Sequence, residues 1–184
     1  MVLGLAIVAV WAFAEAILFF IVADVPISYL AVRRGWRVAT AAAVIAAIAA
    51  VPGGAIVYLW TASDPGAVRD LFIALPRIDA AMIERTADAY YSGGFTAMFE
   101  GSFSGVPYKL FAASAGAGSP PDASMFGFLI ASFFARAPRF VIVGLGTALI
   151  SGALGRRMSL RARLLALALG WIVFYTWYFA TMPG

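Results

Sequence analysis

Residues 92–117 read SGGFTAMFEGSFSGVPYKLFAASAGA, and the way in which this stretch meets the membrane decides the fold. The stretch is largely apolar, but its glycine, serine and proline content is typical of a broken helix. It also contains two charged residues, Glu100 and Lys109, each with apolar sequence on both sides. The flanking segments indicate whether the stretch crosses the bilayer or enters and returns.

The composition of the chain predicts an integral membrane protein. Hydrophobic residues make up 64% of the 184 residues and charged residues only 12%, whereas soluble domains contain roughly 25% charged residues. The length allows one domain with a few spanning helices of about 20 apolar residues each. Cysteine and histidine are absent, which excludes disulfides and nearly all zinc sites. We therefore expect no metal and no cofactor.

The arginines predict the orientation of the spans. They form two tight clusters beside apolar segments, an arrangement typical of cytoplasmic loops rather than of a nucleic-acid surface. The acidic segment 61–91 is then an extracytoplasmic loop with a surface helix, so 38–60 spans outward and 124–150 spans inward. Segment 92–117 must begin and end outside, as a re-entrant hairpin, and 164–181 is a last span. The clusters are Arg33, Arg34 and Arg37, and Arg156, Arg157, Arg161 and Arg163.

A weak internal repeat suggests the arrangement of residues 1–32. Glu15 and Asp24 are nine residues apart, as are Glu100 and Lys109, and the two pairs are offset by 85 residues. The same offset carries 38–60 onto 123–145. We therefore predict an all-α fold, an inverted repeat of re-entrant hairpin plus transmembrane helix with an additional C-terminal span. The alternative is a plain spanning helix over residues 1–23.

Six charged residues lie inside the apolar segments and are the candidate binding residues. A charge near the bilayer centre costs about 2.5–3.5 kcal/mol on insertion scales, so such residues pair or face water. Three acids and three bases sum to zero, and we predict that they share one polar cavity. Structural ion pairing, or snorkelling of some members to an interface, is the alternative. The six are Glu15, Asp24, Glu100, Lys109, Arg136 and Arg139.

The residue types suggest a transporter with an anionic substrate. Lys109, Arg136 and Arg139 can bind a phosphate headgroup, and Glu15 and Asp24 are candidate proton carriers. A membrane-embedded hydrolase is an alternative, because Ser104 lies five residues before Lys109 and a Ser–Lys dyad needs no histidine. A structural assembly protein is a third. Small-residue faces in 40–50 suit either a homodimer or internal packing.

Short motifs resemble those of the DedA superfamily, also called SNARE-associated or VTT-domain proteins. Phe13-Ala14-Glu15 and Ala23-Asp24-Val25-Pro26 are similar to its first hairpin. The Gly105–Phe111 run GVPYKLF is similar to its second hairpin in the YqaA-like branch, and the Ala135–Phe140 run ARAPRF is similar to the start of the next span. The resemblance covers roughly residues 8–150. It implies opposed re-entrant hairpins, with Glu15 and Asp24 as the embedded acids and Lys109 where many members have arginine.

The same resemblance implies a function and a location. Bacterial members are associated with undecaprenyl phosphate recycling and phospholipid flipping, so we expect a multi-pass flippase or scramblase of the bacterial plasma membrane. The chain departs from the family pattern at Ser102 and Phe103, where many members have another arginine. Glu100 is not a family residue, and Pro26 alone remains of a proline-rich first hairpin. These departures concern the substrate more than the fold.

Overall fold

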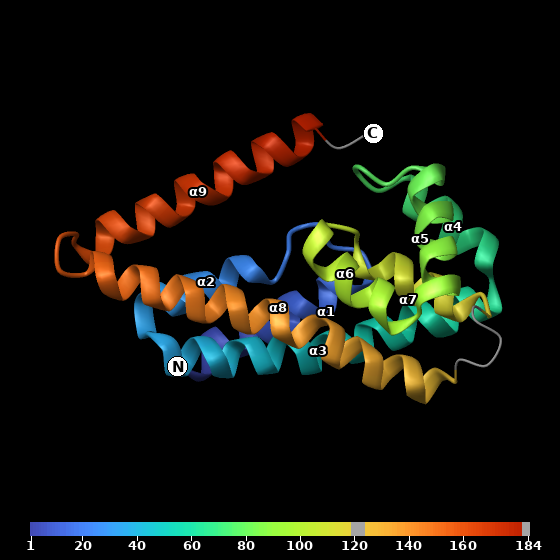
Figure 1. Ribbon diagram of the computed structural model, residues 1–184, viewed down its shortest axis with the longest axis horizontal. Coiled ribbons are helices and arrows are strands. Elements are labelled where there is room, and N and C mark those ends of the chain that lie inside the picture. The colour runs from blue at the N-terminus through green and yellow to red at the C-terminus, as the bar shows by residue number, and fades with distance from the viewer. Residues whose placement is uncertain (119–123, 182–184) are drawn as a thin grey trace.

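The computed structural model describes residues 1–118 and 124–181, which form nine helices and no strand (Figure 1). The described part of the chain is therefore all-helical, as the sequence predicts. In chain order the helices are α1 (Val2–Ile17), α2 (Asp24–Arg34), α3 (Trp36–Ser63), α4 (Pro65–Ile73), α5 (Ala80–Gly93), α6 (Phe95–Ser104), α7 (Tyr108–Gly116), α8 (Met125–Leu154) and α9 (Leu160–Thr181).

Three of these helices, α3, α8 and α9, are long and apolar enough to span a membrane. They correspond to the predicted spans 38–60, 124–150 and 164–181, and each extends a few residues beyond the prediction. Helices α3 and α8 lie along each other in opposite directions and form the centre of the molecule (Figure 1). Neither Pro52 in α3 nor Pro138 in α8 interrupts its helix.

Small residues on one face of α3 explain its close packing. Alanines at 39, 42, 43, 46, 47 and 50 are buried together with Gly53 and Gly54. A Cβ on Gly53 would lie 2.7 Å from the Cβ of Ala16 in α1, so glycine is needed where α1 and α3 touch. Small residues allow helix backbones to approach in apolar surroundings. Large side chains such as Ile48 and Leu59 lie exposed on α3, as expected for a helix that contacts lipid.

The apolar segments 1–32 and 92–117 each form two short helices with a turn between them. Helix α1 has 16 residues and α2 has 11, so they are roughly 24 Å and 16 Å long at 1.5 Å per residue. The bilayer core is about 30 Å thick. The chain reverses between α1 and α2 (Figure 1). Helix α6 ends at Gly105, whose φ of 88° lies in the left-handed region, and α7 begins after Pro107.

The two ends of the molecule differ in charge. Both arginine clusters lie at one end, around the start of α3 and the α8–α9 connection (Figure 1). The acid-rich segment 61–91 lies at the other end and contains α4 and α5. Asp64 caps α4 by accepting from Ala67 N–H at 2.9 Å, and Asp79 caps α5 by accepting from Met82 N–H at 2.6 Å.

Candidate functional site

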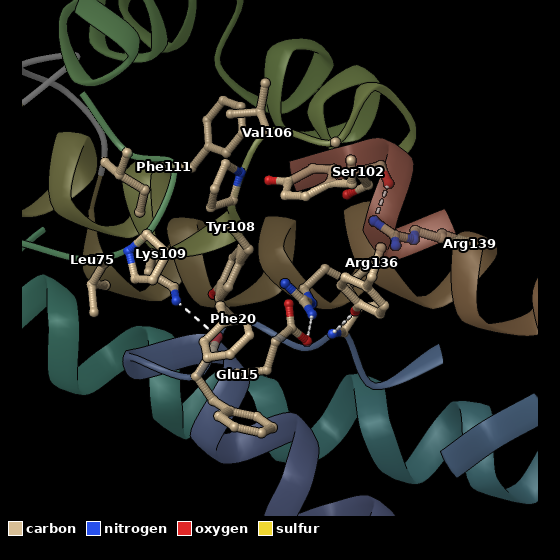
Figure 2. Close-up of a pocket in the computed structure, with 18 of the residues that line it drawn as sticks. Glu15, Phe20, Leu75, Ser102, Val106, Tyr108, Lys109, Phe111, Arg136 and Arg139 are labelled. Carbon is tan, nitrogen blue, oxygen red and sulfur yellow. Dashed lines mark hydrogen bonds and ion pairs between the residues drawn. The ribbon is translucent and has the colours of Figure 1, made fainter. Parts of the chain in front are cut away.

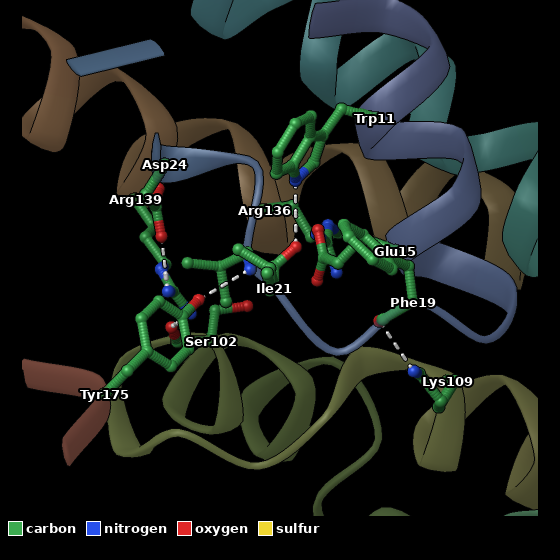
Figure 3. A network of polar contacts seen from close by, with 11 residues as sticks. Trp11, Glu15, Phe19, Ile21, Asp24, Ser102, Lys109, Arg136, Arg139 and Tyr175 are labelled. Atoms are coloured by element: carbon green, nitrogen blue, oxygen red, sulfur yellow. Dashed lines mark hydrogen bonds and ion pairs between the residues drawn. The ribbon is translucent and has the colours of Figure 1, made fainter. Parts of the chain in front are cut away.

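The turn between α1 and α2 exposes its backbone inside the bundle, and side chains from three helices satisfy it (Figure 3). The Trp11 indole N–H donates to Ile21 O at 3.0 Å, and Lys109 Nζ donates to Phe19 O at 2.9 Å. The Tyr175 hydroxyl accepts from Val22 N–H at 2.9 Å. In hydrocarbon an unpaired backbone group is costly. These contacts therefore explain how residues 18–23 can be non-helical inside the bundle.

A buried ion pair joins α1 to α8. Arg136 Nη2 lies 2.5 Å from Glu15 Oε2, and the two side chains are only 7% and 12% exposed. The Arg136 guanidinium also lies over the rings of Tyr108, at 4.5 Å, and Phe140, at 5.0 Å, where cation–π attraction adds to the pairing. Tyr108 fits here because Gly54 has no side chain, since a Cβ there would lie 2.0 Å from the hydroxyl.

A second ion pair joins α2 to α8 and extends to α6. Arg139 donates through Nη2 to Asp24 Oδ2, and through Nη1 to the Ser102 carbonyl at 2.6 Å. Asp24 is in the first turn of α2, where a carboxylate is also favoured by the helix dipole. Its side chain is 2% exposed, whereas that of Arg139 is 25% exposed. Arg139 therefore connects α8 to α2 and α6, and its side chain remains partly exposed.

The structure brings five of the six predicted residues together and leaves one cation in excess. Two acids pair with two arginines, so these four charges sum to zero. Lys109 is buried, and its amino group is bonded to the Phe19 carbonyl, which is neutral. Among the described residues no carboxylate lies within ion-pairing distance of Lys109. The cluster therefore has two acids and three bases, and Lys109 is the base that forms no ion pair within the described residues.

Four of these five residues line a cavity of about 90 Å³ (Figure 2), whereas Asp24, contrary to the prediction, is not part of its lining. That volume is enough for several water molecules. Glu15, Lys109, Arg136 and Arg139 form its polar side, and aromatic side chains from α9 and from the 18–23 turn form much of the rest. A cavity with both polar and aromatic lining can bind a ligand that has both an anionic and an apolar part.

The prediction that Glu100 shares this cavity is wrong. Glu100 is exposed and lines a separate cavity of about 280 Å³ between α5 and α6, together with Arg85. Ser102, two residues on, faces the central cavity, and positions two apart on a helix point in different directions. The predicted Ser104–Lys109 dyad is divided in the same way. Ser104 is exposed in the outer cavity, whereas Lys109 lines the central one.

Sequence reasoning identified Lys109 but missed the other two side chains that bond the turn backbone. Trp11 lies one helical turn before Glu15 on α1, and this spacing could have associated it with the site. Tyr175 lies in the last predicted span, and nothing in the sequence indicated that its hydroxyl would bond the turn. Ser102 contributes through its backbone carbonyl, so its residue type carried no signal.

Comparison of the chain with protein-family models, with curated proteins and with solved structures finds no match. The DedA resemblance therefore rests on the short motifs of this chain alone.

Proposed function

We propose that this chain is a DedA-type membrane transporter, a flippase or scramblase, that moves a lipid with a phosphate headgroup. The observation that carries the proposal is the buried amino group of Lys109, which lines the central cavity and has no carboxylate of the described residues within ion-pairing distance. A buried charge without a counter-charge is unfavourable. An anionic ligand would supply the missing charge.

The proposal includes the arrangement in the membrane. We infer that α1 with α2 and α6 with α7 are opposed re-entrant hairpins of an inverted repeat. Three features support it: each of these helices is too short to cross the bilayer core, both arginine clusters lie at one end, and the hairpins meet where Lys109 bonds Phe19. Inverted repeats typically bind substrate near the midplane between such elements. The expected location is a bacterial plasma membrane.

Two basic residues would bind the headgroup. Lys109 would offer its remaining ammonium donors, and Arg139, which also lines the cavity, would offer guanidinium N–H groups. Hydrogen bonds from charged donors to phosphate are about twice as strong as neutral ones. Glu15 and Asp24 would become available as proton carriers if substrate displaced them from their arginines, which makes proton coupling part of the proposal. Undecaprenyl phosphate and phospholipids are the substrates that the resemblance suggests.

The test separates the charge of Lys109 from its structural bond to the turn. Lys109→Gln keeps an N–H donor for Phe19 O but removes the charge, and Lys109→Arg keeps both. Lipid translocation is measured in proteoliposomes with an isoprenoid phosphate and with anionic phospholipids, with and without a pH gradient. A hydrogen bond to a charged group contributes about 1.5–3 kcal/mol. We therefore expect translocation by the glutamine variant to fall by about 10-fold to 100-fold, and the arginine variant to remain active.

The control is Arg69→Gln, which removes a half-exposed charge outside the site and is expected to leave translocation unchanged. Equal translocation by wild type and Lys109→Gln would contradict the role of the excess charge. If the wild-type protein translocates none of the tested lipids faster than empty vesicles do, the proposal that the chain is a lipid transporter is refuted.

A further inference from the structure

Helix α9 is attached to the rest of the molecule differently from the other spans. Within residues 160–181 no side chain is buried, and α2 is the only helix with which it makes extensive contact. From the α8–α9 connection it runs back over the molecule and diverges from α8 (Figure 1). One edge of α9 nevertheless forms a wall of the central cavity, through Phe174, Tyr175, Tyr178 and Phe179.

Hydrogen bonds hold this edge in place at several levels. At the base, Arg163 Nη1 donates to Ser151 Oγ at 2.8 Å and to its carbonyl at 2.9 Å. Halfway along, the Trp171 indole N–H donates to Ser28 Oγ at 3.0 Å, and Tyr175 bonds the 18–23 turn. Near the far end, Arg77 donates to the Phe179 carbonyl.

This mode of attachment allows the far part of α9 to move. Packing between membrane helices depends on closely fitted surfaces, and single interhelical hydrogen bonds contribute little. Helices α1 and α3 are fitted through small residues, whereas α9 presents bulky aromatic rings and few contacts. The base is held on α8 by two bonds from one arginine. Breaking the bonds at Trp171, Tyr175 and Phe179 would open the cavity toward the membrane without disturbing the buried ion pairs.

We infer that α9 is a lateral gate through which an amphiphile reaches the cavity from within the bilayer. This inference rests on the proposed function and specifies its access route and ligand class. The headgroup passes under the far half of α9 to Lys109 and Arg139, while the hydrocarbon part stays in the membrane against the aromatic edge of α9. The mixed polar and aromatic lining of the cavity favours such a ligand, because a free phosphate would use only the polar groups.

The absence of cysteine from the chain makes a direct test possible. Ser28→Cys with Trp171→Cys places two thiols where side chains now touch, and a short bismaleimide locks the far half of α9 to α2. We expect locking to reduce lipid translocation at least 10-fold, with each single-cysteine protein unaffected by the reagent. Phe20→Cys with Phe179→Cys is a second locking pair, because the centroids of those two rings lie 6.0 Å apart.

A matched control locks the base instead. Ser151→Cys with Arg163→Cys joins positions that also touch, and we expect this crosslink to leave translocation within two-fold of the uncrosslinked protein. Uptake of inorganic phosphate by the same vesicles tests for a soluble ligand. Phosphate uptake that persists in the locked protein would refute the inference that the ligand is an amphiphile.

The outcomes separate the inference from the function on which it rests. No translocation by the uncrosslinked protein would refute the proposed function and the gate with it. Translocation that is equal before and after locking by both far pairs would refute the gate alone. If locking the base through Ser151→Cys and Arg163→Cys reduces lipid translocation as much as locking the far half does, α9 does not pivot at the Arg163 contact.

Discussion

The ion pair between Glu15 and Arg136 allows a quantitative test of the buried site. Glu15→Gln removes the negative charge and keeps the size of the side chain, so the guanidinium of Arg136 is left buried without a counter-charge. The chain offers a matched control in Glu84→Gln. Glu84 pairs with Arg69 at 3.7 Å, but these side chains are 70% and 46% exposed, compared with 12% and 7% for Glu15 and Arg136.

The different exposure of the two ion pairs predicts that the two replacements lower the free energy of unfolding by different amounts. Breaking a buried ion pair by removing one partner costs about 3–5 kcal/mol. The glutamine carbonyl can still accept one hydrogen bond from Arg136, and the rings of Tyr108 and Phe140 still face the cation. We therefore expect the lower end, about 3 kcal/mol. An exposed pair contributes at most about 1 kcal/mol. Because buried pairs are often no more stable than apolar side chains of similar volume, Glu15→Leu with Arg136→Met is expected to recover much of the loss.

The assay is reversible unfolding in mixed micelles, with SDS as denaturant and tryptophan fluorescence as the signal. The free energy of unfolding of Glu15→Gln is compared with that of Glu84→Gln and of the double replacement. A loss below 1 kcal/mol for Glu15→Gln, equal to that of Glu84→Gln, would refute the reasoning from burial. A double replacement less stable than Glu15→Gln alone would show that the pair contributes more than the avoidance of an isolated charge.

Two further predictions concern packing and the turn. Gly116→Ala places a Cβ 2.2 Å from the Tyr58 carbonyl oxygen, so we expect α7 to separate from α3 and the yield of folded, monodisperse protein in size-exclusion chromatography to collapse. Gly146→Ala meets nothing within 4 Å and should leave that yield unchanged. Trp11→Phe removes the donor to Ile21 O and should lower the free energy of unfolding in the SDS titration by about 1–3 kcal/mol. A loss near zero would mean that another group satisfies this carbonyl.

The location of the spans was predictable because it depends on local composition. The long apolar runs around α3, α8 and α9 are visible in the sequence, and no distant contact is needed for such a run to form a helix in lipid. The break between α6 and α7 was also visible, because a glycine followed closely by a proline, as at Gly105 and Pro107, is typical of a helix end. The organisation of segment 61–91 was less predictable, because one surface helix was expected there and the structure has two, α4 and α5.

The membership of the site was predictable only in part. A charge inside an apolar run must find a partner, and this argument correctly brought together Glu15, Asp24, Lys109 and the two arginines of α8. It failed for Glu100, because an 85-residue offset relates positions in the chain but carries no information about the direction of a side chain. Glu100 lies on the face of α6 that points away from the cavity.

The sequence by itself determined that the described chain is helical and that three of its helices can span a bilayer. It also determined that charged residues lie inside the apolar segments. Only the tertiary structure decided which acid pairs with which base. Glu15 and Arg136 are 121 residues apart, and an ion pair depends on a separation of a few ångströms that no sequence pattern specifies. The same holds for the turn bonds of Trp11 and Tyr175, and for the one cation that remains once the pairs have formed.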